Sequence, residues 1–295
     1  MDYKITHTTV YSYSEKVPIC HNEVHLTPRE HPRQKRLTSR LAVRPQPAAI
    51  ENVLDYFGNH VSYFTVEVGH ERLTVTASSR VRLSELSAPL ANGTPWEAIR
   101  DQMASDRSPP FLEACQFAFD SPHVATSPEL SSFAAETFTP GRPWLEALLH
   151  LTRRIHTEFR YDKTATTIST PLDEVLRHRR GVCQDFAHLE IGCLRSLGLP
   201  ARYVSGYLVT APPPGQPRLV GADASHAWVS AFSPDYGWID VDPTNDQIPS
   251  TRHITLAWGR DYSDVAPIKG VFIGGGRHGM SVSVDVAPVS GDGEA

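Results

Sequence analysis

The chain has 295 residues, of which 40% are hydrophobic and 9% aromatic, so it can bury a sizeable core and has room for about two domains. Its net charge is −5 and no run of lysine or arginine is present, which argues against a nucleic-acid partner. No stretch approaches the roughly 18 apolar residues of a membrane span, and residues 1–12 lack the apolar centre of a signal peptide. These features predict a cytoplasmic protein that binds neither nucleic acid nor membrane.

Residues 1–85 are predicted to form a β domain. Polar and apolar residues alternate from Tyr3 to Tyr11 with the period of a strand. Two later runs, 62–68 and 72–76, are rich in β-branched and aromatic residues, and the short break between them predicts a hairpin. A small β-sandwich or barrel is therefore expected.

Residues 86–142 differ in composition and are predicted to be a connecting region with short helices. Prolines separate brief helical pieces such as PWEAIRDQMA and PFLEACQFAF. The region also carries Phe111, Phe117 and Phe133, which need burial, so it need not be flexible.

Residues 143–289 are predicted to form the second domain, an α+β core with helices first and an antiparallel sheet after them. Pro143 starts an amphipathic helix, a shorter helix follows Pro171, and a third begins at Cys183. Strand-like runs then occur at 201–209, 226–232, 237–242 and 280–289. A disordered tail is expected at 290–295.

Cys183 and Cys193 lie on the same predicted helix in different environments. Cys183 sits in the first turn, where unpaired amides and the helix dipole create a positive potential that favours a thiolate. Cys193 lies more than two turns further along, on the apolar stripe that includes Phe186 and Leu189. The sequence therefore predicts that Cys183 is a nucleophile and that Cys193 is an inert packing residue.

A cysteine nucleophile needs a base, and the base needs a partner that orients it. The chain offers 14 histidines. His226 is favoured because it begins a predicted strand after a loop, where a side chain can face a cleft. His188 is nearer in sequence, but its position on the helix turns it well away from Cys183.

The partner of His226 is expected on the next strand. The runs 226–232 and 237–242 can pair as a hairpin through the connection SPDY, which brings His226 close to the end of the second run. Asp240 and Asp242 emerge on the same face of that run, and a proline ends the strand directly after Asp242. The spacing predicts a Cys–His–Asp triad, although strand direction alone leaves both carboxylates open.

Three motifs follow one another in the chain, GVCQDFAHL at 181–189, SHAWV at 225–229 and GWIDVDPT at 237–244. Together they resemble the transglutaminase-like superfamily of papain-type cysteine enzymes. DYFGNHVSYF at 55–64 is similar to the signature of the N-terminal β domain in a bacterial branch of that superfamily. GRDYSDVAPIKG at 259–270 is similar to the C-terminal signature of the branch, so the resemblance covers nearly the full length.

The resemblance implies a papain-like core in which the nucleophile helix packs on a sheet that bears the other two groups. It implies Cys183 as nucleophile, His226 as general base and Asp242 as the orienting residue, with the Asp-Pro-Thr pattern selecting Asp242 over Asp240. The Cys183 amide is one expected oxyanion donor. The side chain of Tyr161 is a candidate for the second donor, and a packing role for it is equally open.

The expected chemistry is acyl transfer at an amide through a thioester. Hydrolysis would make the protein a peptidase or amidase, and transfer to an amine would make it a transglutaminase. Hydrolysis is the first expectation, and a non-catalytic binding module is a further alternative. The expected partner is a peptide, a protein or a small amide substrate, with the oligomeric state left open.

No cofactor or metal is expected. The sequence has no EF-hand-type calcium loop, and its four cysteines contain no CxxC pair that would indicate a standard zinc site. A zinc site built from Cys183, His188 and Cys193 is disfavoured because a single helix cannot bring the three side chains together.

Overall fold

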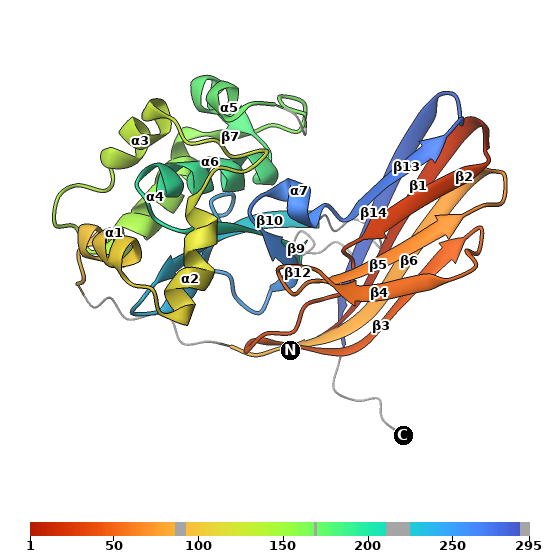
Figure 1. The fold of residues 1–295 in the computed structure, drawn as a ribbon, viewed down its shortest axis with the longest axis horizontal. Coiled ribbons are helices and arrows are strands. Elements are labelled where there is room, and N and C mark those ends of the chain that lie inside the picture. Colours follow the sequence, from red (N-terminus) through yellow and green to blue (C-terminus); the bar gives the residue numbers. More distant parts are fainter. Residues whose placement is uncertain (86–92, 168–169, 211–224, 290–295) are drawn as a thin grey trace, which may run out of the picture.

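A computed structural model of the protein describes residues 1–85, 93–167, 170–210 and 225–289 (Figure 1). The chain is an α+β protein in which a β-sandwich lies beside a sheet covered by helices, as the sequence predicts. The predicted tail at 290–295 and most of the loop between the first two predicted core strands lie outside the described residues. None of the described helices is long and apolar enough to cross a bilayer.

Two antiparallel sheets form the β-sandwich. The first has the order β14-β1-β6-β3 and contains β1 (Asp2–Val17), β3 (Gln34–Arg44), β6 (His70–Leu83) and β14 (His278–Pro288). The second has the order β13-β2-β5-β4 and contains β2 (Ile19–Val24), β4 (Ile50–Leu54), β5 (His60–Val66) and β13 (Ile268–Ile273). Alternate residues such as Ile5, Phe64 and Val75 point between the sheets and form one hydrophobic core.

The hairpin predicted between 62–68 and 72–76 is wrong. β5 pairs with β2 and β4, whereas β6 pairs with β1 and β3, so residues 67–69 cross from one sheet to the other. Both strands bury one face, and that face is what the alternation reveals. A period of two does not distinguish a strand that pairs with its predecessor from one that packs against it across a sandwich.

The last two strands return to the sandwich. β13 pairs with β2 and β14 pairs with β1, each at the edge of its sheet. The boundaries predicted for the core, 143–289, include both strands, so the structure differs from that division. Val284 and Val286 explain the return, because they are buried in the sandwich core. Alternation identified β14 as a strand and contained no information about its partner.

The core consists of one sheet with helices against it. The sheet has the order β11-β10-β9-β12, formed by β9 (Ala201–Leu208), β10 (Ser225–Ser233), β11 (Gly237–Val241) and β12 (His253–Gly259). The main helices are α1 (Trp96–Ser105), α2 (Pro109–Cys115), α3 (Pro128–Ala135), α4 (Trp144–Glu158), α5 (Leu172–His178) and α6 (Cys183–Ser196). Shorter elements are η1 (Gln116–Ala118), α7 (Tyr262–Val265) and the parallel pair β7 (Arg160–Tyr161) and β8 (Arg180–Gly181).

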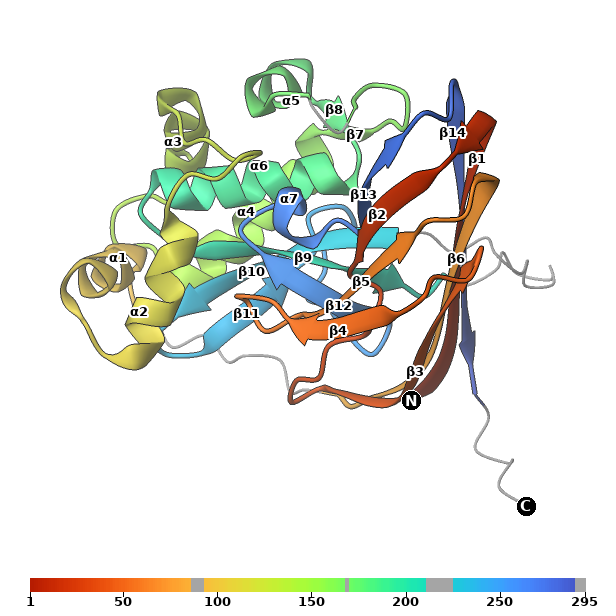
Figure 2. The ribbon, with the colours of Figure 1, turned by 45° about the vertical axis from the view of Figure 1, so that its right-hand side comes forward.

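Helix α6 packs on β9 and β10 at the centre of this domain (Figure 2). The region predicted to connect the two domains contributes its short helices to the same core, where Phe111, Phe117 and Phe133 are buried. Strand β12 carried no pattern that predicted it, and it lies at the edge of the sheet that faces the sandwich.

Two buried amide side chains of the sandwich bind the open edge of β12. Asn59 accepts a hydrogen bond from the Trp258 amide (3.0 Å) and donates one to the Trp258 carbonyl (2.9 Å). Gln34 accepts from the Thr255 amide (2.9 Å) and donates to the Thr255 carbonyl (2.7 Å). Each side chain thus replaces a residue of a neighbouring strand and satisfies the edge of the sheet.

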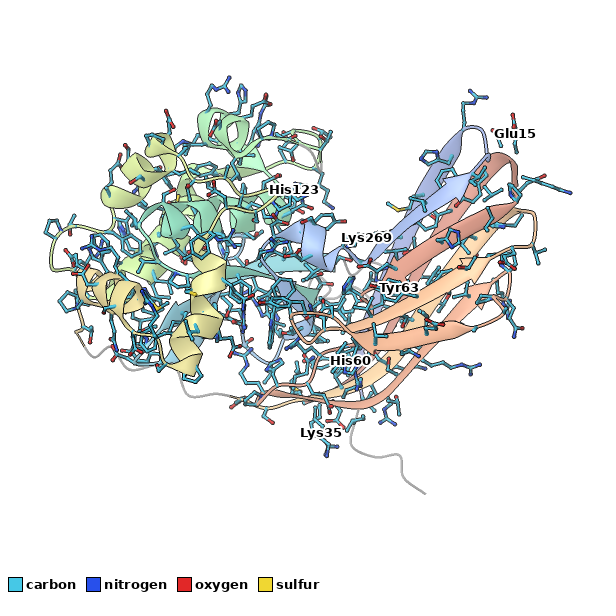
Figure 3. The ribbon with its side chains drawn as sticks, in the orientation of Figure 1. Glu15, Lys35, His60, Tyr63, His123 and Lys269 are labelled. Atoms are coloured by element: carbon cyan, nitrogen blue, oxygen red, sulfur yellow. The ribbon has the colours of Figure 1, made fainter. Side chains whose placement is uncertain are left out.

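A lysine of the sandwich also contacts α7. Lys269 on β13, marked in Figure 3, pairs with Glu23 on β2 through a 2.9 Å Nζ–Oε1 contact. Its Nζ also donates to the Ser263 carbonyl of α7 at 3.0 Å. The sandwich is therefore attached to β12 and to α7, which follows it in the chain.

Replacing Asn59 by alanine should destabilise the protein, because the buried Trp258 amide and carbonyl would lose their partners. Each unsatisfied group costs about 1–3 kcal/mol, so the free energy of unfolding should fall by roughly 2 kcal/mol or more in denaturant titrations. Asn52→Ala is the control and should cost less, since Asn52 is exposed on β4 and its side chain accepts a hydrogen bond from the Ser62 hydroxyl (2.6 Å) without contacting β12. Equal stabilities for the two variants would contradict a docking role for Asn59.

Candidate active site

Helix α6 begins at Cys183 because three residues around it fix its first turn. The Asp185 carboxylate accepts a hydrogen bond from the Val182 amide (2.7 Å) and another from the Thr166 hydroxyl (2.6 Å). A Cβ on Gly181 would lie 2.6 Å from the same carboxylate oxygen, so only glycine fits there. Cys183 is half-buried at the positive end of the helix dipole, as the sequence predicts.

The hairpin predicted between 226–232 and 237–242 is confirmed. β10 and β11 pair antiparallel, with Val229 opposite Val241 and Ser233 opposite Gly237. His226 lies near the start of β10 and Asp242 follows the end of β11, so the two side chains meet. The His226 Nε2 and the Asp242 Oδ2 are 2.8 Å apart.

His226 and Cys183 line the same cavity of about 330 Å³. Because Nε2 of His226 is engaged by Asp242, Nδ1 is the ring nitrogen left for the sulfur. Burial lowers the pKa of His226, but hydrogen bonds to Asp242 and Cys183 and the charges of both groups outweigh it and raise the pKa to about 10. The imidazolium form is therefore favoured at neutral pH beside the sulfur.

Asp242 is fully buried and surrounded by donors. Its Oδ2 also accepts from Nε2 of His253 (3.0 Å) and from Nδ2 of Asn245 (2.8 Å). Its Oδ1 accepts from the backbone amides of Thr244 (3.0 Å) and Asn245 (3.2 Å). Burial alone would raise the pKa of Asp242, but the hydrogen bonds from the two histidines hold it well below its usual range. The group is thus a carboxylate.

The structure shows which candidates for the base and for its partner lie away from the Cys183 cavity. Asp240 does not contact His226; its Oδ2 accepts from Nε1 of Trp228 at 3.2 Å. His188 is buried on α6, where its Nε2 accepts from the Tyr262 amide at 3.1 Å. Burial lowers the pKa of His188 to about 3, so it is neutral.

Tyr161 lines the Cys183 cavity from β7, next to the loop that leads into α6. Its ring packs edge-on against Phe186, and 46% of its side chain is exposed. Burial raises the pKa of Tyr161, and the neighbouring Cys183 and Asp185 add to the effect. The position is compatible both with a donor to a bound carbonyl and with packing.

The sequence analysis missed two residues that donate hydrogen bonds to Asp242, and it missed one wall of the cavity. Asn245 stands in the DPTND run and could have been found from its proximity, whereas no motif marked His253 among the histidines. His253 is neutral because burial lowers its pKa, and its Nδ1 accepts from the Ser250 amide. The missed wall comes from the sandwich and consists of His7, Thr9, Tyr11, Ile268, Met280 and Val282.

One cluster in the described part of the chain has a composition that suits a metal. The ligand atoms of His226, Asp242 and His253 lie within 4.8 Å of one another. Both histidines use Nε2 for a hydrogen bond to the same carboxylate oxygen, so the cluster already satisfies its own polar atoms. The cluster is therefore explained by hydrogen bonds that hold the His226 imidazole in place, and it needs no metal ion to satisfy its polar atoms.

The comparisons with known proteins agree with this geometry. A model of the bacterial transglutaminase-like N-terminal region matches residues 3–82, and a model of the transglutaminase-like superfamily matches residues 131–243. The uncharacterized protein Rv2569c of Mycobacterium tuberculosis is 42% identical over 98% of this chain and 94% of its own length. The chain belongs to the transglutaminase-like superfamily.

Two further proteins extend the comparison for this superfamily member. A solved structure titled "Putative Cysteine Protease", from Cytophaga hutchinsonii, covers 100% of this chain and 92% of its own, with a TM-score of 0.78 and 21% identity. It shows the same fold over both halves of the molecule. A protein-glutamine gamma-glutamyltransferase of Pseudomonas aeruginosa is 31% identical over 43% of this chain and 23% of its own length.

Alkylation should distinguish the two cysteines of α6. At about pH 6, iodoacetamide should modify Cys183 at least about tenfold faster than Cys115, because an imidazolium beside the sulfur stabilises the thiolate. Cys193 should stay unmodified in the folded protein, since it is fully buried. Peptide mass spectrometry gives the rate at each site. His226→Gln should remove the advantage of Cys183, and an unchanged rate in that variant would contradict the pairing.

Glu190→Gln should change how stability depends on pH. Glu190 is completely buried on α6, where it accepts from the Thr152 hydroxyl at 2.7 Å, and burial raises its pKa from 4.5 to about 8. Between these values the folded state holds the proton more tightly, so the wild-type free energy of unfolding should fall as the pH rises. Over this pH range the free energy of unfolding of the variant should fall by at least about 1 kcal/mol less than that of the wild type. Parallel curves in denaturant titrations would contradict the burial of an ionisable carboxyl.

Proposed function

We propose that the protein is a cysteine-dependent enzyme that cleaves amide or peptide bonds through a thioester on Cys183. One observation carries this proposal: an imidazole held at 2.8 Å from a buried carboxylate shares a cavity with a sulfur at the start of a helix. This combination supplies a nucleophile, a proton donor and a fixed orientation for the donor.

In the first step, the Cys183 thiolate attacks the carbonyl carbon and the C=O π electrons move to oxygen. Amides in the first turn of α6 have no acceptor within the helix, so the Cys183 amide can donate to the oxyanion. Collapse of the intermediate breaks the C–N bond while His226 gives its Nδ1 proton to the leaving amine. Asp242 keeps the ring in place through Nε2.

In the second step, water attacks the thioester and His226 takes a proton from it. The C–S bond breaks, a carboxylic acid leaves, and the sulfur and imidazole return to their starting state. The substrate is a peptide, a protein or a small amide, and the cytoplasmic location stays a prediction of the sequence. Water and a primary amine are equivalent at this step, so amine transfer is the second candidate. The named activity of the Pseudomonas aeruginosa relative supports that alternative.

The test is a glutamine-peptide library incubated with and without a labelled primary amine. Wild type should release ammonia or new peptide ends, and Cys183→Ala should lose the activity. Asp242→Asn should reduce kcat by roughly a hundredfold or more, because the imidazole loses its orienting group. Cys115→Ala is the matched control, as Cys115 lies on α2 outside the cavity.

Each result assigns the chemistry. Hydrolysis products without amine incorporation support the hydrolase, and incorporation of the label supports the transferase. Activity that survives Cys183→Ala would overturn the proposal for both. A binding module would show the same absence of turnover in wild type and in Cys183→Ala across the library.

A further inference from the structure

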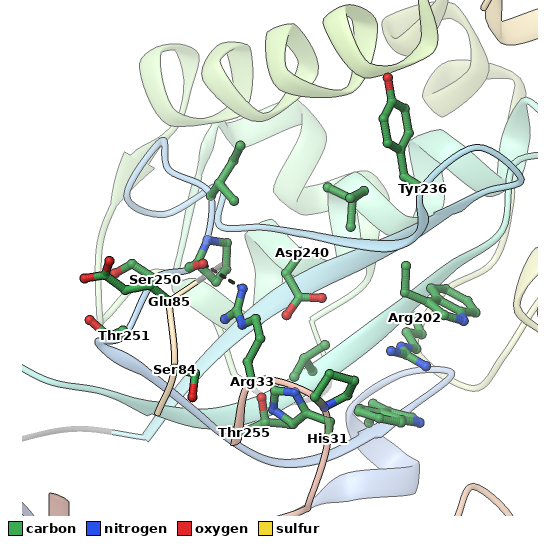
Figure 4. A pocket seen from close by; sticks show the side chains of 17 residues that line it. His31, Arg33, Ser84, Glu85, Arg202, Tyr236, Asp240, Ser250, Thr251 and Thr255 are labelled. Atoms are coloured by element: carbon green, nitrogen blue, oxygen red, sulfur yellow. Dashed lines mark hydrogen bonds between the residues drawn. The ribbon is translucent and has the colours of Figure 1, made fainter. Parts of the chain in front are cut away.

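A second cavity, of about 710 Å³, lies on the other face of the catalytic sheet (Figure 4). Arg202 and Val204 of β9 line it, whereas Tyr203 between them points toward α6 and lines the Cys183 cavity. The two cavities have no lining residue in common. The volume lies within the range of about 300–1,000 Å³ that is typical of small-molecule sites.

Arg202 is the central feature of this cavity. Only 6% of its surface is exposed, and its guanidinium lies between the rings of Trp238 (4.1 Å) and Trp258 (3.8 Å). Arg29 covers the opposite face of Trp258 at 3.5 Å. The indoles therefore occupy both faces of the Arg202 guanidinium and leave its edge, with all its N–H groups, for other partners.

Those N–H groups have no acceptor among the described residues. Nε of Arg202 is buried without a hydrogen bond, and no ion pair joins the guanidinium to a carboxylate in the described ranges. A buried, unpaired cation is costly, and an acceptor in the plane of the guanidinium would remove that cost. Burial lowers the pKa of Arg202 only to about 9, so the group stays charged at neutral pH.

The remaining charges select the kind of anion. Arg33 adds a second cation, which donates to the Pro249 carbonyl at 2.9 Å, while Asp240 and Glu85 add two carboxylates. Figure 4 shows Arg33 and Asp240 near each other at the centre of the view, with Arg202 to their right. A dianion such as a phosphate would be repelled by both acids, whereas a single carboxylate can bind the guanidinium edge. Apolar walls complete the lining with Pro32, Val204, Tyr236, Ile239 and Ile248.

We propose that this cavity binds a small carboxylate with a flat, apolar body. The carboxylate oxygens accept in-plane hydrogen bonds from Arg202, and the apolar body packs against the Trp238 side of the cavity. The two indoles hold the guanidinium in one orientation before the ligand arrives, which reduces the entropy lost on binding. The site is independent of the chemistry proposed for Cys183.

The probes are 3-phenylpropionate, its neutral amide and phenyl phosphate, measured by calorimetry on the full chain. The acid should bind saturably and at least about tenfold more tightly than the amide, a difference of about 1.4 kcal/mol. Phenyl phosphate should bind more weakly than the acid. Equal affinity for acid and amide, or no saturable binding of the acid up to its solubility limit, would overturn the proposal.

Variants assign the binding to this cavity. Arg202→Gln should abolish the preference for the acid, Arg33→Gln should weaken it, and Asp240→Asn should strengthen it by removing a like charge. Arg153→Gln is the matched control, because Arg153 is exposed on α4. Since Arg202→Gln could fail to fold, the opposite effects at Arg33 and Asp240 keep the test decisive, and unchanged affinity in both would overturn the site.

Two further experiments show where 3-phenylpropionate binds and what kind of molecule carries the carboxylate of the natural ligand. Alkylation of Cys183 should leave binding of 3-phenylpropionate intact; loss of binding would place the probe in the other cavity and overturn the assignment. An alanyl-phenylalanine dipeptide and its C-terminal amide distinguish a peptide end from a free acid. Both sources present the carboxylate that Arg202 would recognise.

Discussion

The buried carboxylate of Asp242 is the interaction on which the candidate active site depends. It orients His226, and His253, Asn245 and two backbone amides share its remaining lone pairs. A buried charge is tolerated only when such donors surround it, and its negative charge in turn favours the imidazolium. The chain turns back after β11, with a proline directly after Asp242, so that the donors at 244 and 245 reach the carboxylate that precedes them.

The sandwich forms one wall of the candidate active site. Its first strand supplies Tyr11 and its last strand supplies Met280 to the Cys183 cavity, and these two residues are paired in the β1–β14 ladder. The position of this wall depends on the amide side chains of Gln34 and Asn59, which bind the edge of the catalytic sheet. The first and last strands, β1 and β14, thus contribute side chains to the cavity that Cys183 and His226 line.

Local patterns predicted the elements that carry the chemistry, and long-range pairing explains what they missed. The helix start at Cys183 and the hairpin that joins His226 to Asp242 follow from signals within a few residues. His253 lies on a strand whose place in the sheet is set by pairing with β9, far away in sequence. The crossing at 67–69 and the return of β14 likewise depend on which strand each strand pairs with. The periodicity of the sequence indicates only which face of a strand is buried.

Asp240 and Asp242 are close in sequence but lie in different surroundings. Asp240 lies on β11 and Asp242 directly follows the end of that strand, and two carboxylates so close would repel each other if both faced the same group. Trp228 separates them: its indole nitrogen donates to Asp240, and its ring lies 6.1 Å from that of His226. Asp242 is paired with His226, whereas Asp240 lines the second cavity and forms no ion pair with Arg202. The two carboxylates thus have different partners, the indole nitrogen of Trp228 and the imidazole of His226, although they lie close together in sequence.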